Sequence, residues 1–381
     1  MQVKCLLVTV FLYAILAQCS SIYDVLKLNI DQEKHSKVLI LVLSRLGLAN
    51  RLRSMADWYS IAIASERKMI VMWDITRDCT AGYTDLFEGG SLYLTVIGSE
   101  NESSSVEIIV QLVENINRTN HVLTDENMWA KDFNSYVISK DVIESDTQIV
   151  ITAYDGVLSM EDIDCQQYIA SHSHFLSNLV PIAEVRNYVD NLYSEYFSSL
   201  TMVGVHYRAH DPEQDWAVVP PLLGSPVDKV FGEGASIEDF ARVMRDIQSH
   251  RLTMGDNIRF FIASNSPEAK TALGSQFPSA IFLGGDHRRD VLEGMKLALV
   301  EWILLSKSAL LLHTYGSTFA EQASMVHIRP IVGIWESLLL QHSHPNLPYC
   351  GNQQYARAYG RNNRKAKYRT GLNTDHSEVI V

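Results

Sequence analysis

The sequence predicts an α/β protein of two domains, each with a parallel β-sheet flanked by helices. Three observations predict this fold class. The chain of 381 residues is long for one hydrophobic core, so two domains are expected. A buried strand, an amphipathic helix and a second buried strand follow one another near the beginning. The same alternation returns in a longer series after Thr201 and describes a Rossmann-like sheet.

Residues 1–19 are predicted to form a secretory signal peptide. Lys4 precedes a short apolar run, which ends at Ala17 and is followed by small residues. The alternative is an uncleaved signal anchor, and a membrane partner is expected only in that case. Either way, the rest of the chain is expected in the lumen of the endoplasmic reticulum or Golgi, or outside the cell. Two glycosylation sequons, at Asn101 and Asn117, agree with this expectation.

Charge and cysteine content narrow the classes of function. The net charge of -12 argues against a nucleic-acid partner, because such a protein needs basic surface to meet phosphates. Beyond the signal peptide, one disulfide can form among Cys79, Cys165 and Cys350, and the sequence does not select the pair. The core therefore has to supply most of the stability.

The elements of the N-terminal domain, residues 36–200, follow from hydrophobic patterns. KVLILVLS, at residues 37–44, and MIVMW, at residues 69–73, are apolar runs typical of buried strands. Between them, residues 48–66 have apolar side chains at helical spacing, which predicts a helix and completes a βαβ unit. Residues 90–146 are polar and indicate variable connections. A strand is expected over residues 147–154 and a helix over residues 183–199. The expected buried face of the first helix consists of Leu52, Met55, Tyr59 and Ile63.

The C-terminal domain, residues 201–340, is predicted from the strongest alternation in the chain. Ser236 is an expected N-cap, with Asp239 in the first helical turn. Two such domains in tandem suggest a cleft between them, because ligands of these sheets sit at the carboxyl ends of the strands. Residues 341–381 form a polar, basic tail. Strands are expected over residues 201–208, 257–264, 279–283, 309–314 and 330–334, and helices over residues 236–250, 266–277, 290–308 and 316–326.

The loop SRLGLANRLRS joins the first strand to the first helix, at an edge where ligands sit. Gly47 keeps the backbone approachable, and Asn50 can bind a hydroxyl or cap the helix. Arg51 and Arg53 lie in the first helical turn, where the helix dipole disfavours cations. They are compensated either by a bound anion or sugar, or by an acidic side chain. The acids expected in reach are Asp57 and Asp85.

A second set of polar residues ends the first strand of the C-terminal domain, in VGVHYRAHD. Side chains alternate along a strand, so His206 and Arg208 project from one face at its carboxyl end. The arginine fork suits phosphate oxygens, and burying it without an anion is costly. Anion binding is therefore predicted for Arg208, and a structural ion pair between domains is the alternative.

A third motif, HTYGSTFAEQAS at residues 313–324, runs from a strand through a small-residue turn into a helix. The N–H groups at such a helix start, together with the hydroxyls of Ser317 and Thr318, make an anion cradle. Ordinary helix capping is the alternative.

Three short patterns are compatible with metal binding, and each has a plainer explanation. Asp-Ile-Asp at residues 162–164 lacks a preceding apolar strand, so a surface turn is expected. The His-Ser-His triplets at residues 172–174 and 342–344 have zinc-compatible spacing on a strand, but no third ligand follows nearby. Solvated histidines are expected there, and no metal site is predicted.

In this order, the motifs resemble the GDP-fucose-dependent fucosyltransferase superfamily: protein O-fucosyltransferases, α-1,6-fucosyltransferases and bacterial nodulation fucosyltransferases. LGLAN with RLRS resembles the N-terminal loop of the family, and VHYRAHD resembles its H-x-R motif. RFFIASNSPEAKTAL and EWILLSKSALLLHTYGSTFAE resemble the second and third blocks, and together these segments cover most of residues 38–334. The resemblance implies a GT-B-like fold of two Rossmann-like domains and GDP-fucose as co-substrate.

Carried over by position, the resemblance implies a role for each matching residue. Arg208 would hold the β-phosphate and neutralise the departing GDP, and His206 would orient the site. Glu301 would bind guanine, and Asn50 would face the sugar and the acceptor. Ala209 stands where the α-1,6 enzymes carry a second arginine, which favours a protein O-fucosyltransferase-like or divergent member. The other expected substrate-binding residues are Gly47, Arg51, Arg53, Ser264, Asn265, Ser317, Thr318 and Phe319.

The predicted reaction is inverting transfer of fucose from GDP-fucose to a hydroxyl of a glycan or glycoprotein. Charge develops on the diphosphate as the anomeric bond breaks, and Arg208 with a helix N-terminus can stabilise it without a metal ion. A general base would deprotonate the acceptor hydroxyl. Two alternatives stay open: a non-catalytic secreted protein that binds sugar or nucleotide, and a transferase that uses another nucleotide sugar. The candidate bases are Asp211, Glu213, Asp215 and, on the first helix, Asp57.

Overall fold

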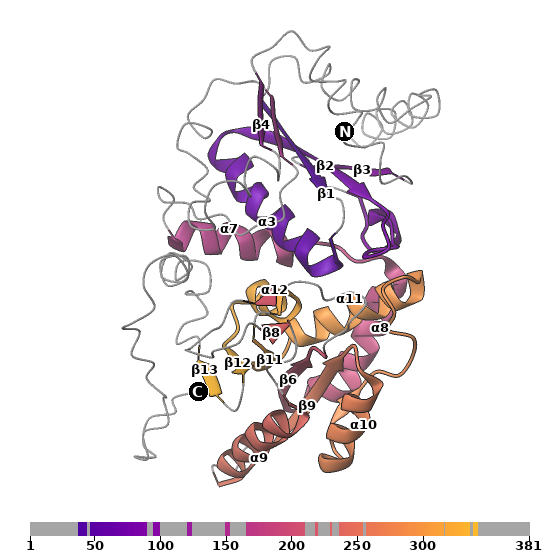
Figure 1. The fold of residues 1–381 in the computed structure, drawn as a ribbon, viewed down its shortest axis with the longest axis vertical. Coiled ribbons are helices and arrows are strands. Elements are labelled where there is room, and N and C mark those ends of the chain that lie inside the picture. Colours follow the sequence, from indigo (N-terminus) through magenta and orange to yellow (C-terminus); the bar gives the residue numbers. More distant parts are fainter. Residues whose placement is uncertain are drawn as a thin grey trace.

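The computed structural model contains two large β-sheets, with helices between and below them, and one two-stranded sheet (Figure 1). The structure describes residues 37–43, 46–89, 94–99, 120–123, 149–152, 165–209, 218–219, 229–230, 236–253, 257–315, 317–335 and 338–341.

The first sheet contains five parallel strands. They are β1 (Lys37–Leu43), β2 (Arg67–Asp74), β3 (Leu94–Ser99), β4 (Asn120–Leu123) and β5 (Ile149–Thr152), in the order β3-β2-β1-β5-β4. The strands expected at residues 37–44, 69–73 and 147–154 are confirmed as β1, β2 and β5. β3 and β4 lie within residues 90–146, so the expectation of variable connections alone was wrong. Both are edge strands: β3 pairs with β2, and β4 pairs with β5. Their formation depends on this backbone pairing more than on a hydrophobic pattern in their own sequences.

The second sheet has the order β10-β9-β6-β11-β12-β13 and is parallel except at β13. All its expected strands and helices are confirmed, whereas β13 was not predicted. Ser236 is the expected N-cap, because its Oγ accepts from the Asp239 N–H at 3.1 Å. The strands are β6 (Thr201–Tyr207), β9 (Ile258–Ser264), β10 (Ile281–Phe282), β11 (Leu310–Thr314), β12 (Ile331–Trp335) and β13 (Leu338–Gln341). The helices are α9 (Ile237–Thr253), α10 (Pro267–Gln276), α11 (Leu292–Ser306) and α12 (Thr318–Val326), and a separate ribbon pairs β7 (Val218–Val219) with β8 (Lys229–Val230).

Three further helices lie nearer the first sheet or between the sheets: α3 (Leu48–Ala64), α7 (Cys165–Ser177) and α8 (Ala183–Leu192), with a short 3-10 turn, η1 (Tyr83–Asp85). α8 continues into a π-helical turn, η2 (Tyr193–Phe197), so the helix expected over residues 183–199 is confirmed in place but changes its hydrogen-bonding pattern. α7 was not predicted, and because residues 172–174 lie in this helix, the zinc-compatible spacing that a strand would give does not apply to them.

Helix α3 is buried around most of its circumference. It packs against β1 and β2 on one side and against α7 and α12 on the other. The expected buried positions Leu52 and Met55 have no exposed surface, but Ile63 is 47% exposed, which corrects the predicted face. Ile63 lies in the last turn of the helix. Because the helix is enclosed from two sides, polar residues such as Ser54 and Asp57 are buried as well.

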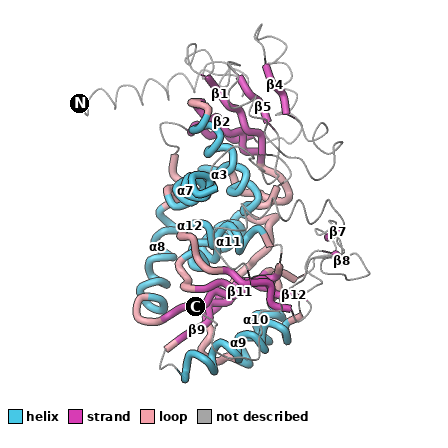
Figure 2. The backbone as a smooth tube through the Cα atoms, turned by 90° about the vertical axis from the view of Figure 1, so that its left-hand side faces the viewer, coloured by secondary structure: helices cyan, strands magenta, loops and turns pink. Residues whose placement is uncertain are grey.

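The sheets and helices form successive layers (Figure 2). The first sheet is followed by α3 and α7, then by α12 and α11, then by the second sheet, with α9 and α10 on its far side. One cluster of buried apolar side chains runs through the helical layers and includes Leu41 of β1, Trp58 of α3 and Leu305 of α11. α8 packs on α11, although the prediction placed it in the N-terminal domain. The division at residue 200 and a cleft between domains stay predictions.

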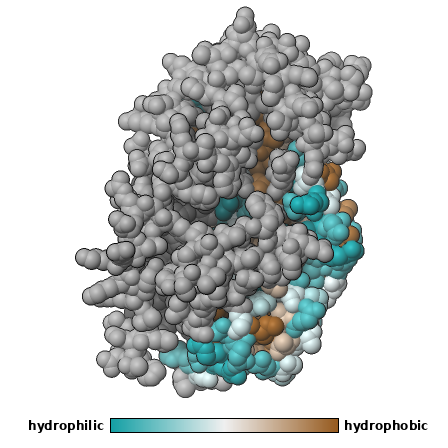
Figure 3. All heavy atoms as spheres, viewed as in Figure 1, coloured by the Kyte–Doolittle hydropathy of each residue, from teal (hydrophilic) through white to brown (hydrophobic). Residues whose placement is uncertain are grey.

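The described surface is mostly hydrophilic on the face drawn in Figure 3, where apolar residues form only small patches. Within the part of the chain that the structure describes, no helix is long and apolar enough to cross a membrane.

Candidate functional site

Three parallel strands of the second sheet end side by side, and their carboxyl ends carry the polar residues that the sequence analysis selected. β6 lies between β9 and β11, so His206 is paired with Ala263 on one side and with His313 on the other. Because parallel strands present their carboxyl ends at one edge, the three sequence motifs of this half meet there.

His206 is buried at this edge and contacts the start of α12. Its Nδ1 lies 3.1 Å from Ser317 Oγ. Its ring stacks on the Phe319 ring, with centroids 5.0 Å apart and an angle of 25° between the planes. One ring face and one ring nitrogen are thereby held, so the end of β6 and the first turn of α12 are fixed relative to each other.

Arg208 follows β6 in a segment whose backbone is held from both sides. Its N–H donates to Thr314 Oγ1 at the end of β11, at 2.9 Å. The next residue, Ala209, donates its N–H to Asn265 Oδ1 at 2.9 Å and accepts at its carbonyl from Asn265 Nδ2 at 3.2 Å. Arg208 itself is partly exposed. Its backbone is therefore anchored while its side chain can reach a ligand.

Ser264 and Asn265 hold backbone groups, and their role in substrate binding stays a prediction. The Asn265 amide is engaged at both its oxygen and its nitrogen by Ala209. Ser264 is buried, and its Oγ accepts from the Ser266 N–H at 3.0 Å. Asn265 thereby fixes the backbone next to Arg208, and Ser264 fixes the turn that follows β9.

The start of α12 presents backbone N–H groups at the same edge. Ser317 is the N-cap residue, but its hydroxyl lies at His206 and does not cap the helix. The first N–H groups of a helix have no partner within the helix, and the helix dipole makes this end attractive to anions. Thr318 and Phe319 begin the helix, as the third motif predicted.

At this edge, the positively charged Arg208 and Lys270 lie near the neutral ring of His206. Burial, together with the positive charges of Arg208 and Lys270, lowers the pKa of His206 to about 3. Both cations therefore act on the ring from nearby. A neutral ring among cationic groups leaves the edge suited to an anion.

The stability of the protein should depend on His206 between about pH 6.5 and about pH 3. In this range the folded state keeps the ring neutral, whereas the unfolded chain takes up a proton. Stability is therefore present above pH 6.5 and falls as the pH drops, by up to about 1.4 kcal/mol for each pH unit. Replacing His206 with phenylalanine should flatten this slope, which urea unfolding at several pH values measures. An equal slope in both proteins would contradict a buried neutral ring.

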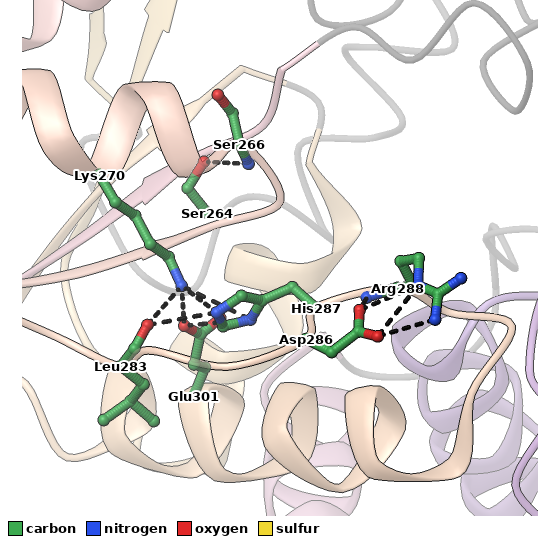
Figure 4. A network of polar contacts seen from close by, with 8 residues as sticks. All are labelled: Ser264, Ser266, Lys270, Leu283, Asp286, His287, Arg288 and Glu301. Atoms are coloured by element: carbon green, nitrogen blue, oxygen red, sulfur yellow. Dashed lines mark hydrogen bonds and ion pairs between the residues drawn. The ribbon is translucent and has the colours of Figure 1, made fainter.

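Glu301 on α11 lies in a buried polar network (Figure 4). Lys270 Nζ is 2.7 Å from its Oε1, and this ammonium also lies 2.6 Å from His287 Nε2 and 3.1 Å from the Leu283 carbonyl. Burial raises the pKa of Glu301 to about 7, although Lys270 acts in the opposite direction. Burial likewise lowers the pKa of Lys270. A guanine contact by Glu301, which stays a prediction, would have to be made by a carboxyl group that already pairs with Lys270.

Asn50 in the first turn of α3 has an unsatisfied carbonyl oxygen. Its Oδ1 is buried and has no hydrogen-bond partner among the described residues. Gly47 is the N-cap of this helix, with extended backbone and no side-chain cap. Arg53, one turn further, is attracted by Glu321 of α12. The acidic-partner alternative therefore applies to Arg53, whereas the binding of a hydroxyl by Asn50 stays a prediction.

Arg51 is a structural residue, and its predicted role in substrate binding is corrected. Its guanidinium has no exposed surface. Nε donates to the Leu46 carbonyl at 2.7 Å, and the two terminal nitrogens donate to the Asp74 carbonyl and to Thr76 Oγ1. The guanidinium also lies over the Trp73 ring, 4.8 Å from its centroid. Backbone carbonyls, the Trp73 ring and the carboxylates of Asp74 and Asp78 compensate this charge, in place of the expected Asp57 or Asp85.

His172 and Asp57 are buried together, which corrects two further expectations. His172 has no exposed surface and lies 3.0 Å from Asp57 through Nδ1 and Oδ1, so it is not a solvated histidine. Asp57 is equally buried and is therefore not placed to serve as the general base.

Cys79 is a free, buried cysteine, so it takes no part in a disulfide. Burial raises the pKa of its thiol.

Some predicted features lie outside the described residues. They are the signal peptide, the sequons at Asn101 and Asn117, the candidate bases Asp211, Glu213 and Asp215, the segments 162–164 and 342–344, and Cys350. Within the described ranges, no group of three or more His, Cys, Asp or Glu side chains could hold a metal ion.

Lys270, His287 and Thr314 lie at or near the site but were not predicted from the sequence. The burial of Lys270 could have been predicted from the sequence, because Lys270 lies between Ala269 and Leu273 on the apolar face of α10. Thr314 ends an apolar strand in the same way as the H-x-R segment does. His287 lies in a loop after β10 and had no signal in the sequence.

Comparisons with known proteins relate the fold to one group of enzymes. No protein-family model matches the sequence, and no curated protein is detectably similar to it. The solved structure of the fucosyltransferase NodZ from Bradyrhizobium is 17% identical, with a TM-score of 0.52 over 78% of this chain and 96% of that chain. NodZ α-1,6-fucosyltransferase co-crystallised with GDP is 16% identical, with a TM-score of 0.50 over 78% and 94% of the two chains. A mutant of Arabidopsis thaliana FUT1 in complex with GDP is 16% identical, with a TM-score of 0.50 over 80% and 73%. The chain therefore shares the GT-B-like α/β fold of these fucosyltransferases.

Proposed function

We propose that the protein transfers fucose from GDP-fucose to a hydroxyl of a glycan or glycoprotein. The observation that carries this proposal is the convergence of Arg208, the Lys270 charge and the start of α12 around His206. A diphosphate is the anion that fits such a set, because a guanidinium fork and helix N–H groups both bind phosphate oxygens. The GDP complexes of NodZ and Arabidopsis FUT1, which have the same fold, support GDP as the leaving group.

Each residue at the edge has a proposed role in this reaction. Arg208 binds the β-phosphate and stabilises the charge that develops on GDP as the anomeric bond breaks. The first turn of α12, with Ser317, Thr318 and Phe319, cradles the phosphates. His206 stays neutral and holds Ser317 and Phe319 in place. Asn50 of α3 accepts a hydrogen bond from a hydroxyl of the sugar or the acceptor.

Transfer is proposed to invert the anomeric centre and to need no essential metal, because Arg208 and the helix start supply the positive charge that a divalent ion supplies elsewhere. The acceptor hydroxyl attacks the sugar and gives its proton to a base, while the bond to the GDP oxygen breaks. Asp211 and Asp215, which follow Arg208 closely in the sequence, are the proposed bases.

The test is a panel of nucleotide sugars, with detection of the released nucleotide and the glycosylated product. GDP should be released from GDP-fucose in the presence of acceptor, and a chelator should leave the rate unchanged. GDP binding without turnover of any donor would favour a non-catalytic binding protein. Release of another nucleotide would show that the donor is a different nucleotide sugar. Loss of activity in a chelator, with recovery on adding manganese, would overturn the role of Arg208.

The proposed place of action is the secretory lumen or the exterior. Its support is the sequence of residues 1–19 and the sequons at Asn101 and Asn117. An acceptor that is a glycan or glycoprotein is available in that compartment. Fractionation of cells that express the full chain tests this, and a cytosolic protein would contradict it.

A further inference from the structure

A buried polar bridge joins three helices between the two sheets. It consists of Asp57 on α3, His172 on α7 and Gln322 on α12, which we call the His172 bridge. His172 Nδ1 lies 3.0 Å from Asp57 Oδ1, and His172 Nε2 lies 2.7 Å from Gln322 Oε1. None of the three residues has exposed surface. One imidazole ring therefore connects a helix of the first sheet to a helix of the second, through a side chain of α7.

Two of these helices begin at the candidate site. Asp57 lies two turns after Asn50, and Gln322 lies one turn after Thr318, so each pair shares one face of its helix. α3 and α12 pack against each other, and Arg53 and Glu321 attract one another between the bridge and the helix starts. The bridge therefore fixes the helices close to the turns that carry Asn50 and Ser317.

The chemistry of the His172 bridge indicates that it orients α3 and α12 more than it stabilises the fold. Replacing a buried ion pair by apolar side chains of similar size is often neutral or stabilising, because removing charge from water is costly. The surrounding contacts between these helices are apolar and tolerate small shifts. His172 is hydrogen-bonded to Gln322 through Nε2 and lies within ion-pair distance of Asp57 through Nδ1, so a shift of α12 or α3 changes one of these two distances.

We infer that the His172 bridge is a positioning device that sets the first turn of α3 against the first turn of α12. In terms of the proposed function, on which this inference rests, it places the Asn50 oxygen at the sugar or acceptor while Ser317 and Arg208 hold the diphosphate. His172, Asp57 and Gln322 touch no substrate. They act through the two helices.

The experiment compares Gln322→Leu and His172→Leu with the wild-type full-length protein. GDP affinity should fall less than turnover, because the contact between His206 and Ser317 still holds the start of α12 at the second sheet in both variants. Turnover for each GDP-binding site should fall about 10- to 100-fold, because a shift of about 1 Å at a reacting group has an effect of this size. Isothermal titration with GDP counts the sites, so partial unfolding is not mistaken for a loss of turnover.

Two variants separate positioning from folding. Gln322→Glu keeps an acceptor oxygen at the same reach and should retain most of the turnover. His174→Leu changes the exposed histidine one position past Ser173 on α7 and should behave as wild type. Wild-type turnover per site in Gln322→Leu would overturn the inference, as would equal losses in Gln322→Leu and Gln322→Glu. If His172→Leu fails to fold, the two Gln322 variants decide, since they keep the pair of Asp57 and His172.

Hydrogen exchange tests the bridge independently of the reaction. Gln322→Leu should speed exchange in the first turns of α3 and α12 and leave α9, which lies on the far side of the second sheet, unchanged (Figure 2). Unchanged exchange in both first turns would overturn the inference. A wild-type protein that turns over no GDP-fucose would overturn the proposed function instead, and the exchange result would still decide on the bridge.

Discussion

Replacing Arg208 with alanine should lower the turnover number with GDP-fucose by about 10²- to 10³-fold. The Arg208 backbone is fixed by Thr314, and the following residue by Asn265, so its guanidinium is held in advance where charge develops on the leaving diphosphate. The variant loses this donor fork while the backbone contacts remain. Steady-state rates of GDP release at saturating donor and acceptor measure the effect.

Two matched variants show whether the position or the charge matters. Arg208→Lys keeps a cation but loses the planar fork, so it should recover only part of the activity. Arg259→Ala removes an arginine at the opposite, amino end of β9 and should keep the rate within about twofold, since an isolated surface change has little effect. Full activity in Arg208→Ala would remove this residue from the mechanism.

Replacing Glu301 with alanine should lower the free energy of unfolding by about 3–5 kcal/mol, because it leaves a buried ammonium without its partner. Lys270 and Glu301 are 5% and 6% exposed at their side chains, and their atoms are 2.7 Å apart. Burial opposes the charge of both groups, as the directions of their pKa changes show. Urea unfolding at pH 8 measures the loss.

Glu293 on the same helix provides the control. It pairs with Lys296 at 3.3 Å, but its side chain is 72% exposed, so Glu293→Ala should have an effect of at most about 1 kcal/mol. The double variant Glu301→Leu with Lys270→Met removes both charges and should be markedly more stable than Glu301→Ala alone. Equal stability of Glu301→Ala and the wild type would mean that Lys270 is solvated in the native protein.

The predictable part of the fold is the part that hydrophobic runs define. β1, β2, β6 and β11 are central strands covered on both faces, so each contains an apolar run that stands out in the sequence. Edge strands β3, β4 and β13 are short or lie in polar segments, and their pairing depends on a neighbouring strand already being in place. Helix α7 was not predicted for a related reason, because its sequence is rich in polar residues and its buried face is covered only by α3 and α12.

The contrast between two arginines shows the same limit at the site. The alternation of side chains along β6 was enough to place Arg208 at the carboxyl end of a central strand, next to His206. No local feature of the sequence distinguishes Arg51 from Arg208, since each arginine comes after a buried strand in a motif of small and polar residues. Arg51 became structural through the Asp74 carbonyl, Thr76 and the Trp73 ring, which lie more than twenty residues further along the chain.

By itself, then, the sequence determined the alternation of strands and helices, the sheet edge at which His206, Arg208 and Ser317 meet, and the resemblance that names a donor. These depend on period and order along the chain, which are local properties. Only the tertiary structure decided that Arg51 is enclosed, that Glu301 pairs with Lys270, and that Asp57, His172 and Gln322 join three helices. Each of these is a buried polar contact between distant segments, and the need to satisfy a buried charge acts only once packing has removed the water.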